Sequence, residues 1–223
     1  ERAVLMQMAS QVRLLEGPLP WYQYEGSSGA IGTNHGLPRF KESSFEAAYP
    51  FGQVNLSTPQ IPVSIKIKSF NPLIPGDVDN SSLPVAVIDF ELTNTSGKEI
   101  SFSICGNMQN FIGEDGSQGK ASKNKNAFRS ENGINGILFT SGGVDTKADQ
   151  WGEIALVTPP AEKISYRTAW SPKGWGSSML DYWDDFSNDG ILGNRVDTSS
   201  NKPMASLAVS DLLPPHGTKT IRF

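Results

Sequence analysis

The chain has 223 residues, with 19 Lys and Arg against 23 Asp and Glu, and its formal net charge is -4. This mildly acidic balance argues against a nucleic-acid or anionic-membrane surface, which needs clustered positive charge. Hydrophobic residues make up 37% of the chain and its apolar runs are short, so we expect a soluble globular protein with a buried core and no transmembrane segment.

The first clear strands lie in residues 61–94. Between residues 61 and 67 every second residue is Ile or Val, while Ser64, Lys66 and Lys68 take the opposite side, as in a half-buried strand. Residues 85–94 alternate in the same way, with Asp89 and Glu91 facing outward. The turn 95–98 leads into another alternating stretch. We therefore predict a β-hairpin of residues 85–94 and 99–106.

The remaining strands are predicted from shorter patterns of the same kind. The 22 glycines and 15 prolines lie between them, which is typical of a chain with many turns. Residues 113–132 are polar and predict a long exposed loop. We expect an all-β fold, a large antiparallel β-sandwich of two packed sheets, as a single domain over residues 1–223. The other predicted strands are 48–56, 134–140, 152–158, 163–169, 204–209 and 218–223.

Residues 177–190, SSMLDYWDDFSNDG, predict one short helix. Ser178 is a candidate N-cap with Asp181 three residues later, and Gly190 follows the predicted end. The side chains expected on its buried stripe are Leu180, Trp183 and Phe186.

The acids of this helix are a candidate catalytic or calcium site. Paired carboxylates are what glycosidic cleavage needs, and carboxylate oxygens also suit calcium. An EF-hand register begun at Asp185 places Val196 where a bidentate acid belongs. We therefore favour a solvated helix face over a catalytic or metal role. The acids in question are Asp181, Asp184, Asp185 and Asp189.

Polar residues elsewhere are assigned to turns or to the core. Asp77 and Asp79, in the loop 71–86, could also hold calcium, but Asp next to glycine and proline caps its own backbone equally well. His35 and His216 lie beside glycine and are expected to be exposed, without a zinc site. We predict no metal site and no cofactor. The residues considered as candidate metal ligands are Asp77, Asp79, Asp185 and Asp189.

Cys105 is the single cysteine, which excludes an internal disulfide. Its setting, ISFSICGNM, is that of a strand interior. We therefore interpret it as a small core residue and not as a nucleophile.

Tryptophans supply a candidate contact surface. Trp170 and Trp175 flank the sequence SPKG and could stack on the apolar face of a sugar. Alternatively, they and Trp183 cover the edge of the sandwich or contact another domain, which is the reading we favour.

Several segments carry a resemblance to a known family. They are YPFGQVNL (49–56), IPVSIKIKSFNPLIPGDVDNSSLPVAVIDFELTNTSGKEISFSICGNMQN (61–110) and WGEIALVT (151–158), followed in the same order by YWDDFSNDGIL and LLPPHGTKTIRF. Together they resemble the N-terminal domain of glycoside hydrolase family 116, the family of non-lysosomal glucosylceramidases and related bacterial β-glucosidases. The resemblance covers most of the chain from about residue 36. The family's glycine-rich opening segment is matched only by the short GAIGT (29–33).

The resemblance implies a large β-sandwich followed by a C-terminal (α/α)6 barrel that carries the catalytic residues. The family hydrolyses β-linked glucosides with retention and without a metal or organic cofactor. No array of helices is predicted here, so we expect the barrel to be absent and carry over no catalytic residue. The implied partners are the C-terminal helical catalytic domain of the same polypeptide and, through it, a β-glucoside or glucosylceramide substrate.

Three hypotheses follow for the function. We favour a non-catalytic N-terminal domain that packs against the barrel and helps to shape the rim of its active site. A free-standing carbohydrate-binding module is the alternative, and a self-sufficient hydrolase using the acids of 181–189 is the third. Both ends of the chain look cut, since no initiator methionine or signal peptide opens it, so we expect an excised piece of a longer enzyme. Its cellular location is not predicted.

Overall fold

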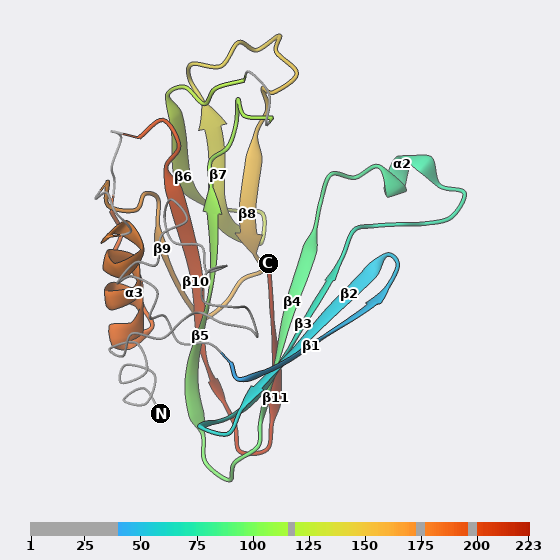
Figure 1. Ribbon diagram of the computed structural model, residues 1–223, viewed down its shortest axis with the longest axis vertical. Helices are drawn as coiled ribbons and strands as arrows, with labels where there is room; N and C mark the ends of the chain where they lie inside the picture. Colours follow the sequence, from blue (N-terminus) through green and yellow to red (C-terminus); the bar gives the residue numbers. More distant parts are fainter. Residues whose placement is uncertain (1–39, 116–118, 173–176, 196–199) are drawn as a thin grey trace, which may run out of the picture.

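The computed structural model describes residues 40–115, 119–172, 177–195 and 200–223 (Figure 1). Within these residues the chain forms eleven strands and two short helices. The strands are β1 (Glu42–Ala48), β2 (Phe51–Thr58), β3 (Ile61–Phe70), β4 (Val87–Asn94), β5 (Ile100–Gln109), β6 (Asn124–Glu131), β7 (Ile134–Ser141), β8 (Ile154–Thr158), β9 (Lys163–Arg167), β10 (Met204–Leu213) and β11 (Thr218–Arg222). The helices are α2 (Val78–Ser81) and α3 (Ser177–Asp189).

All the strands pair antiparallel, in three sheets. The five-stranded sheet has the order β1-β2-β3-β4-β11, the central sheet β5-β10-β9, and the β6–β8 sheet β6-β7-β8. The predicted all-β antiparallel class is confirmed. The number of sheets and helices differs from the prediction of two sheets and one helix. The layer facing the central sheet consists of two separate sheets (Figure 1). A second helix, α2, lies in the loop after β3.

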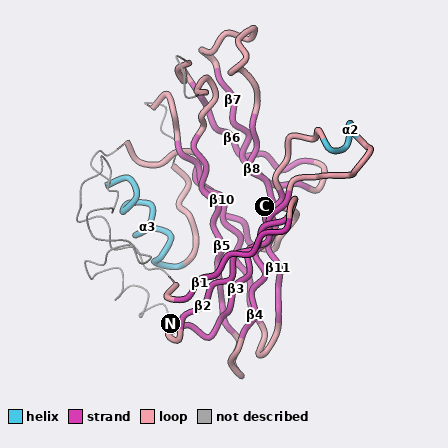
Figure 2. Tube along the Cα trace, turned by 45° about the vertical axis from the view of Figure 1, so that its right-hand side comes forward, coloured by secondary structure: helices cyan, strands magenta, loops and turns pink. Residues whose placement is uncertain are grey.

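One face of the central sheet packs against both other sheets. Val209 and Leu213 of β10 belong to a core with Val63 and Leu92 of the five-stranded sheet. Leu207 of β10 belongs to a second core with buried residues of β7. Since residues 207, 209 and 213 share one face of a strand, the two facing sheets cover successive parts of the same surface (Figure 2). Full burial of such a side chain stabilises by roughly 1.5–3 kcal/mol.

The other face of the central sheet lies against α3. Tyr182 of α3 and Leu192 form a third core with Ala208 of β10. The neighbouring residues on this face of β10 are small, and both Ser206 and Ala208 are fully buried. Small side chains let the helix approach the strand closely. The strand β10 is therefore covered on both faces, which explains its nearly continuous burial.

The predicted hairpin of residues 85–94 and 99–106 is wrong. The strand β4 pairs with β3 and β11, whereas β5 pairs with β10, so residues 95–99 cross from one sheet to another. Buried Asn94 holds this crossing, because its Nδ2 donates to the carbonyls of Lys98 (2.7 Å) and Pro214 (3.0 Å). A second crossing, residues 214–217, runs beside the first and leads from β10 to β11. The backbone N–H of His216 donates to the carbonyl of Ser96 and so joins the two crossings. Turn residues alone do not distinguish this crossing from a hairpin.

The predicted loop 113–132 contains a strand, β6. It forms a hairpin with β7 through Asn132 and Gly133, both at positive φ, which is the two-residue Asn-Gly turn. The inward positions of β6 include Asn124 and Asn126, whose amides bond to backbone carbonyls in the interior. Polar residues thus occupy core positions, so the hydrophobic alternation that marks a strand is missing.

The ends of the predicted strand 48–56 and of the predicted helix also shift. The strand is β2, preceded by an additional edge strand, β1, whose residues are all exposed and mostly polar. The helix begins at Ser177, and Ser178 Oγ donates to the carbonyl of Ser171. Its buried side is built around Tyr182, with Trp183 and Phe186 packed beside it.

The loop 71–86 is a structured connection between β3 and β4. Asp77 is the N-cap of α2, and its carboxylate accepts from the backbone N–H of Asn80 at 3.0 Å. The hydrogen bond from the Asn80 side chain, and then this backbone bond, lower the pKa of Asp77. In the part of the chain that the structure describes, no helix is both long and apolar enough to cross a membrane.

The role of Asn94 is testable. Asn94→Ala removes a buried amide that donates to the carbonyls of Lys98 and Pro214 and accepts from the Ser96 N–H, and the loss of these hydrogen bonds together costs about 1–3 kcal/mol. Urea denaturation should show a loss of that size in the free energy of unfolding. Asn71→Ala removes one exposed bond to the Val85 carbonyl and should cost about 1 kcal/mol or less. Equal losses for the two variants would contradict the assignment.

Candidate functional site

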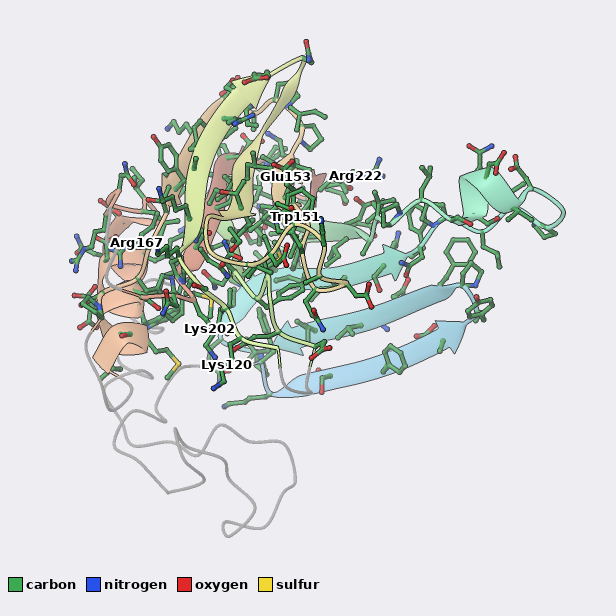
Figure 3. All side chains as sticks on the ribbon, turned by 90° about the horizontal axis from the view of Figure 1, so that it is seen from above. Lys120, Trp151, Glu153, Arg167, Lys202 and Arg222 are labelled. Atoms are coloured by element: carbon green, nitrogen blue, oxygen red, sulfur yellow. The ribbon has the colours of Figure 1, made fainter. Side chains whose placement is uncertain are left out.

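The acids predicted from the helix surround a buried arginine. Arg167, the last residue of β9, has a side chain that is 0% exposed. Its Nη1 lies 3.2 Å from Asp181 Oδ2, and its Nη2 lies 2.6 Å from Asp185 Oδ2. Asp181 and Asp185 are four residues apart on α3, so they occupy the same side of the helix and reach one guanidinium. Figure 3 shows Arg167 beside α3, away from Trp151, Glu153 and Arg222.

The same group of charges holds the segment after the helix. Arg167 Nε donates to the carbonyl of Gly193 (3.1 Å), and the Gly193 N–H donates to Asp185 (2.8 Å). The half-exposed Arg195 lies 2.8 Å from Asp181 Oδ2. The cluster Arg167, Asp181, Asp185 and Arg195 therefore joins β9, α3 and residues 190–195, and we call it the arginine cluster.

Burial decides what the arginine cluster can do. A guanidinium out of water is tolerated only when carboxylates and carbonyls compensate its charge, and here Asp181, Asp185 and the Gly193 carbonyl surround it. The side chains of Asp181 and Asp185 are 11% and 32% exposed. Their charge is therefore committed to the interior. This geometry favours a structural role for these two acids over acid–base chemistry.

The other two acids of the helix lie apart from the cluster. Asp184 and Asp189 are exposed. Asp189 Oδ1 accepts from the backbone N–H of Ile191 at 2.9 Å, just past the end of α3. The predicted solvated face therefore describes Asp184 and Asp189, but not Asp181 and Asp185.

The predicted metal ligands are not brought to one place. Asp77 and Asp79 lie on the α2 loop, on the other side of the molecule from α3 (Figure 1). Asp185 is paired with Arg167. Among the described residues, no group of three or more His, Cys, Asp and Glu side chains is arranged to hold a metal ion.

Two of the three predicted contact tryptophans lie under or on α3. The ring of Trp170 stacks on Tyr182, with 4.5 Å between centroids and 11° between planes, and its Nε1 donates to Ser206 Oγ (2.7 Å). Trp183 is partly buried against the same core. Trp175 lies outside the described residues. The geometry makes Trp170 and Trp183 part of the layer between α3 and the central sheet.

A chain of hydrogen bonds continues from Trp170 across the central sheet. Ser206 Oγ donates to Asn107 Oδ1, and Asn107 Nδ2 donates to Tyr182 Oη at 3.1 Å. Cys105 packs beside Tyr182 and Trp170 on this face. Burial raises the pKa of the Cys105 thiol to about 11 and also raises the pKa of the Tyr182 phenol. A thiol held protonated supports the predicted core role over a nucleophilic one.

Sequence reasoning missed Arg167. The signal was present, because the predicted strand KISYRTA places an arginine among residues otherwise suited to a covered strand. A charge there requires a partner, and the acids of the predicted helix, which begin at Asp181, were candidates for it.

Comparison with known families gives one match. The family model described as "beta-glucosidase 2, glycosyl-hydrolase family 116 N-term" matches residues 5–223, which is nearly the whole chain.

The geometry of the arginine cluster predicts that loss of Arg167 lowers the stability of the fold more than loss of Arg195. Arg167→Ala leaves Asp181 and Asp185 without their buried partner, and breaking a buried ion pair costs about 3–5 kcal/mol. Arg195→Ala removes only a half-exposed partner and should cost about 1 kcal/mol or less. Urea denaturation of both variants measures the difference. A loss below 1 kcal/mol for Arg167→Ala would show that the cluster does not hold α3.

The burial of Cys105 predicts that its thiol is alkylated slowly in the folded chain. A pKa of about 11, against 9.0 for a free thiol, lowers the thiolate fraction at pH 8 by roughly 100-fold. Alkylation by iodoacetamide at pH 8 should therefore be slower by at least that factor in the folded chain than in 8 M urea. The rate should rise with pH until about pH 11. Equal rates in the folded and unfolded chain would contradict the burial of this thiol.

Proposed function

Because this chain belongs to the N-terminal-domain family of glycosyl hydrolase family 116, we propose that it is the non-catalytic β-sandwich domain of a β-glucosidase or glucosylceramidase. A separate helical domain of the same polypeptide cleaves the glycosidic bond. The β-sandwich domain packs against that helical domain and supports the rim of its active site. Residues 1–223 form one such domain.

The single observation that carries this proposal is the pairing of both helix acids with buried Arg167. A retaining glycosidase needs two carboxyl groups about 5–5.5 Å apart across the sugar, one of them able to give up a proton. Asp181 and Asp185 both contact the guanidinium of Arg167, which is 0% exposed and takes the place that a sugar would need between them. Pairing with buried Arg167 is a structural task.

The positions of Trp170 and Trp183 support a scaffold over a sugar-binding surface. A carbohydrate-binding module offers flat, exposed ring faces to the sugar. Trp170 instead stacks on Tyr182 and donates its N–H to Ser206, and Trp183 packs into the same core. These rings stabilise the layer between helix and sheet, as a supporting domain requires.

An activity assay tests the proposal. The parent polypeptide should hydrolyse p-nitrophenyl β-glucoside, whereas residues 1–223 alone should show no turnover above the buffer rate. In the parent polypeptide, Asp185→Asn and the exposed control Asp184→Asn should both keep the wild-type kcat, with Asp185→Asn losing thermal stability.

Two results would contradict the proposal. The first is turnover by residues 1–223 alone that Asp185→Asn abolishes while circular dichroism shows an unchanged fold. The second is saturable quenching of tryptophan fluorescence by glucosides or glucans in residues 1–223, which would instead indicate a carbohydrate-binding module.

A further inference from the structure

The chain contains two Asn-Gly pairs, and the structure places them in unlike surroundings. Asn132 and Gly133 form the two-residue turn between β6 and β7. Asn135 and Gly136 follow inside β7. Asparagine is thermolabile, and a following glycine exposes the next amide nitrogen to the asparagine side chain because glycine has no Cβ. The same reactive dipeptide therefore occurs once in a turn and once inside a strand.

The pair in the turn is open to solvent. Asn132 and Gly133 are both exposed, with φ of 52° and 76°. A Cβ built on Gly133 would meet no other part of the molecule within 4 Å. The pair of Glu131 and Ile134 closes the hairpin, so the peptide bond between Asn132 and Gly133 lies outside the ladder of strand hydrogen bonds. This bond can turn without breaking the ladder.

The pair in the strand is enclosed. Asn135 is aligned with Ser130 of β6 on one side and with Thr158 of β8 on the other, because β7 is the middle strand of its sheet. Gly136 is buried, and a Cβ built on it would lie 2.5 Å from the carbonyl oxygen of Leu156. Rotation of the peptide bond between Asn135 and Gly136 therefore requires strand hydrogen bonds to break.

We propose that Asn132 is a site of spontaneous deamidation and isoaspartate formation in the folded protein, whereas β7 protects Asn135. The backbone nitrogen of Gly133 attacks Cγ of Asn132 and gives its proton to a solvent base. The bond between Cγ and Nδ2 breaks, and ammonia leaves. This inference stands apart from the proposed function, because it uses only the β6–β7 hairpin and water.

Water completes the reaction. It opens the five-membered succinimide ring at either of the two carbonyl carbons. Opening at Cγ restores the original main chain with an aspartate at position 132. Opening at the backbone carbonyl carbon leaves the main chain running through Cβ, which is isoaspartate. Neither step oxidises or reduces a group.

The hairpin has no slack to absorb isoaspartate. The register of β6 and β7 runs without a shift up to the pair of Glu131 and Ile134. Isoaspartate adds one carbon to the main chain of a two-residue turn whose twist has to match that of the strands. We expect the hairpin to fray next to the turn, whereas the stretch at Phe128 and Ile137 stays in place because both residues pack in a hydrophobic core.

Mass spectrometry of aged protein tests the proposal. One tryptic peptide, residues 130–147, contains both asparagines, so its fragment ions report the two sites from the same sample. In the folded chain at pH 8 and 37 °C, Asn132 should be converted at least about tenfold faster than Asn135, because a turn opens more easily than a middle strand. In 8 M urea the two sites should react at similar rates.

A variant and a second measurement complete the test. Asn132→Gln lengthens the side chain by one methylene, so ring closure requires a larger ring and position 132 should stop reacting. The rate at Asn135 should stay unchanged in this variant. Amide hydrogen exchange next to the turn should be faster in the aged wild-type chain than in the fresh one.

Two results would overturn the proposal. Equal rates at Asn132 and Asn135 in the folded chain would show that β7 gives no protection. Conversion of Asn132 in urea but not in the folded chain would show that the turn itself holds the side chain away from the Gly133 nitrogen.

Discussion

The burial of the Arg167 guanidinium is the constraint on which the layer of α3 depends. A full positive charge in the interior needs compensating anions, and these come from two acids one turn apart on α3. The same side chain bonds to Gly193, so the chain leaving the helix is fixed as well. The aromatic contacts of Tyr182 and Trp170 stabilise the layer, but hydrophobic contacts are not directional. The ion pairs and the hydrogen bond from Asn107 to Tyr182 therefore fix where along the central sheet the helix lies.

The central sheet explains why the molecule has two unlike sides. Its strand β10 is covered by α3 on one face and by two different sheets on the other. The β6–β8 sheet contributes buried residues to the core, whereas the five-stranded sheet is covered only over β3, β4 and β11. The remaining hairpin, β1–β2, carries exposed Phe45 on one face and the hydrogen bonds of Asn55 to Ser44 and Glu46 on the other.

Buried asparagines make the connections that apolar side chains cannot make. Asn94 bonds two crossings between sheets, and Asn110 and Asn124 bond the ends of β6 and β7 to the segment after β5. Each amide satisfies backbone carbonyls where the chain leaves a ladder of strand hydrogen bonds, so these positions hold strand order and register together. Sequence reasoning assigns such residues to turns or exposed loops, which is why it predicted a hairpin after β4 and a loop in place of β6.

The sequence by itself determined the fold class, most of the strands, the helix near residue 180 and the family, because these follow from local alternation, turn residues and long motifs. It also determined that Asp89 and Glu91 face outward, since neighbouring residues of a strand lie on opposite faces. Only the tertiary structure decided which strands pair and which acids are buried. Pairing depends on contacts between residues far apart in the chain, as between β4 and β11. The role of Asp181 and Asp185 depends on Arg167, which reaches them only because α3 packs on the face of the central sheet to which β9, its edge strand, directs Arg167.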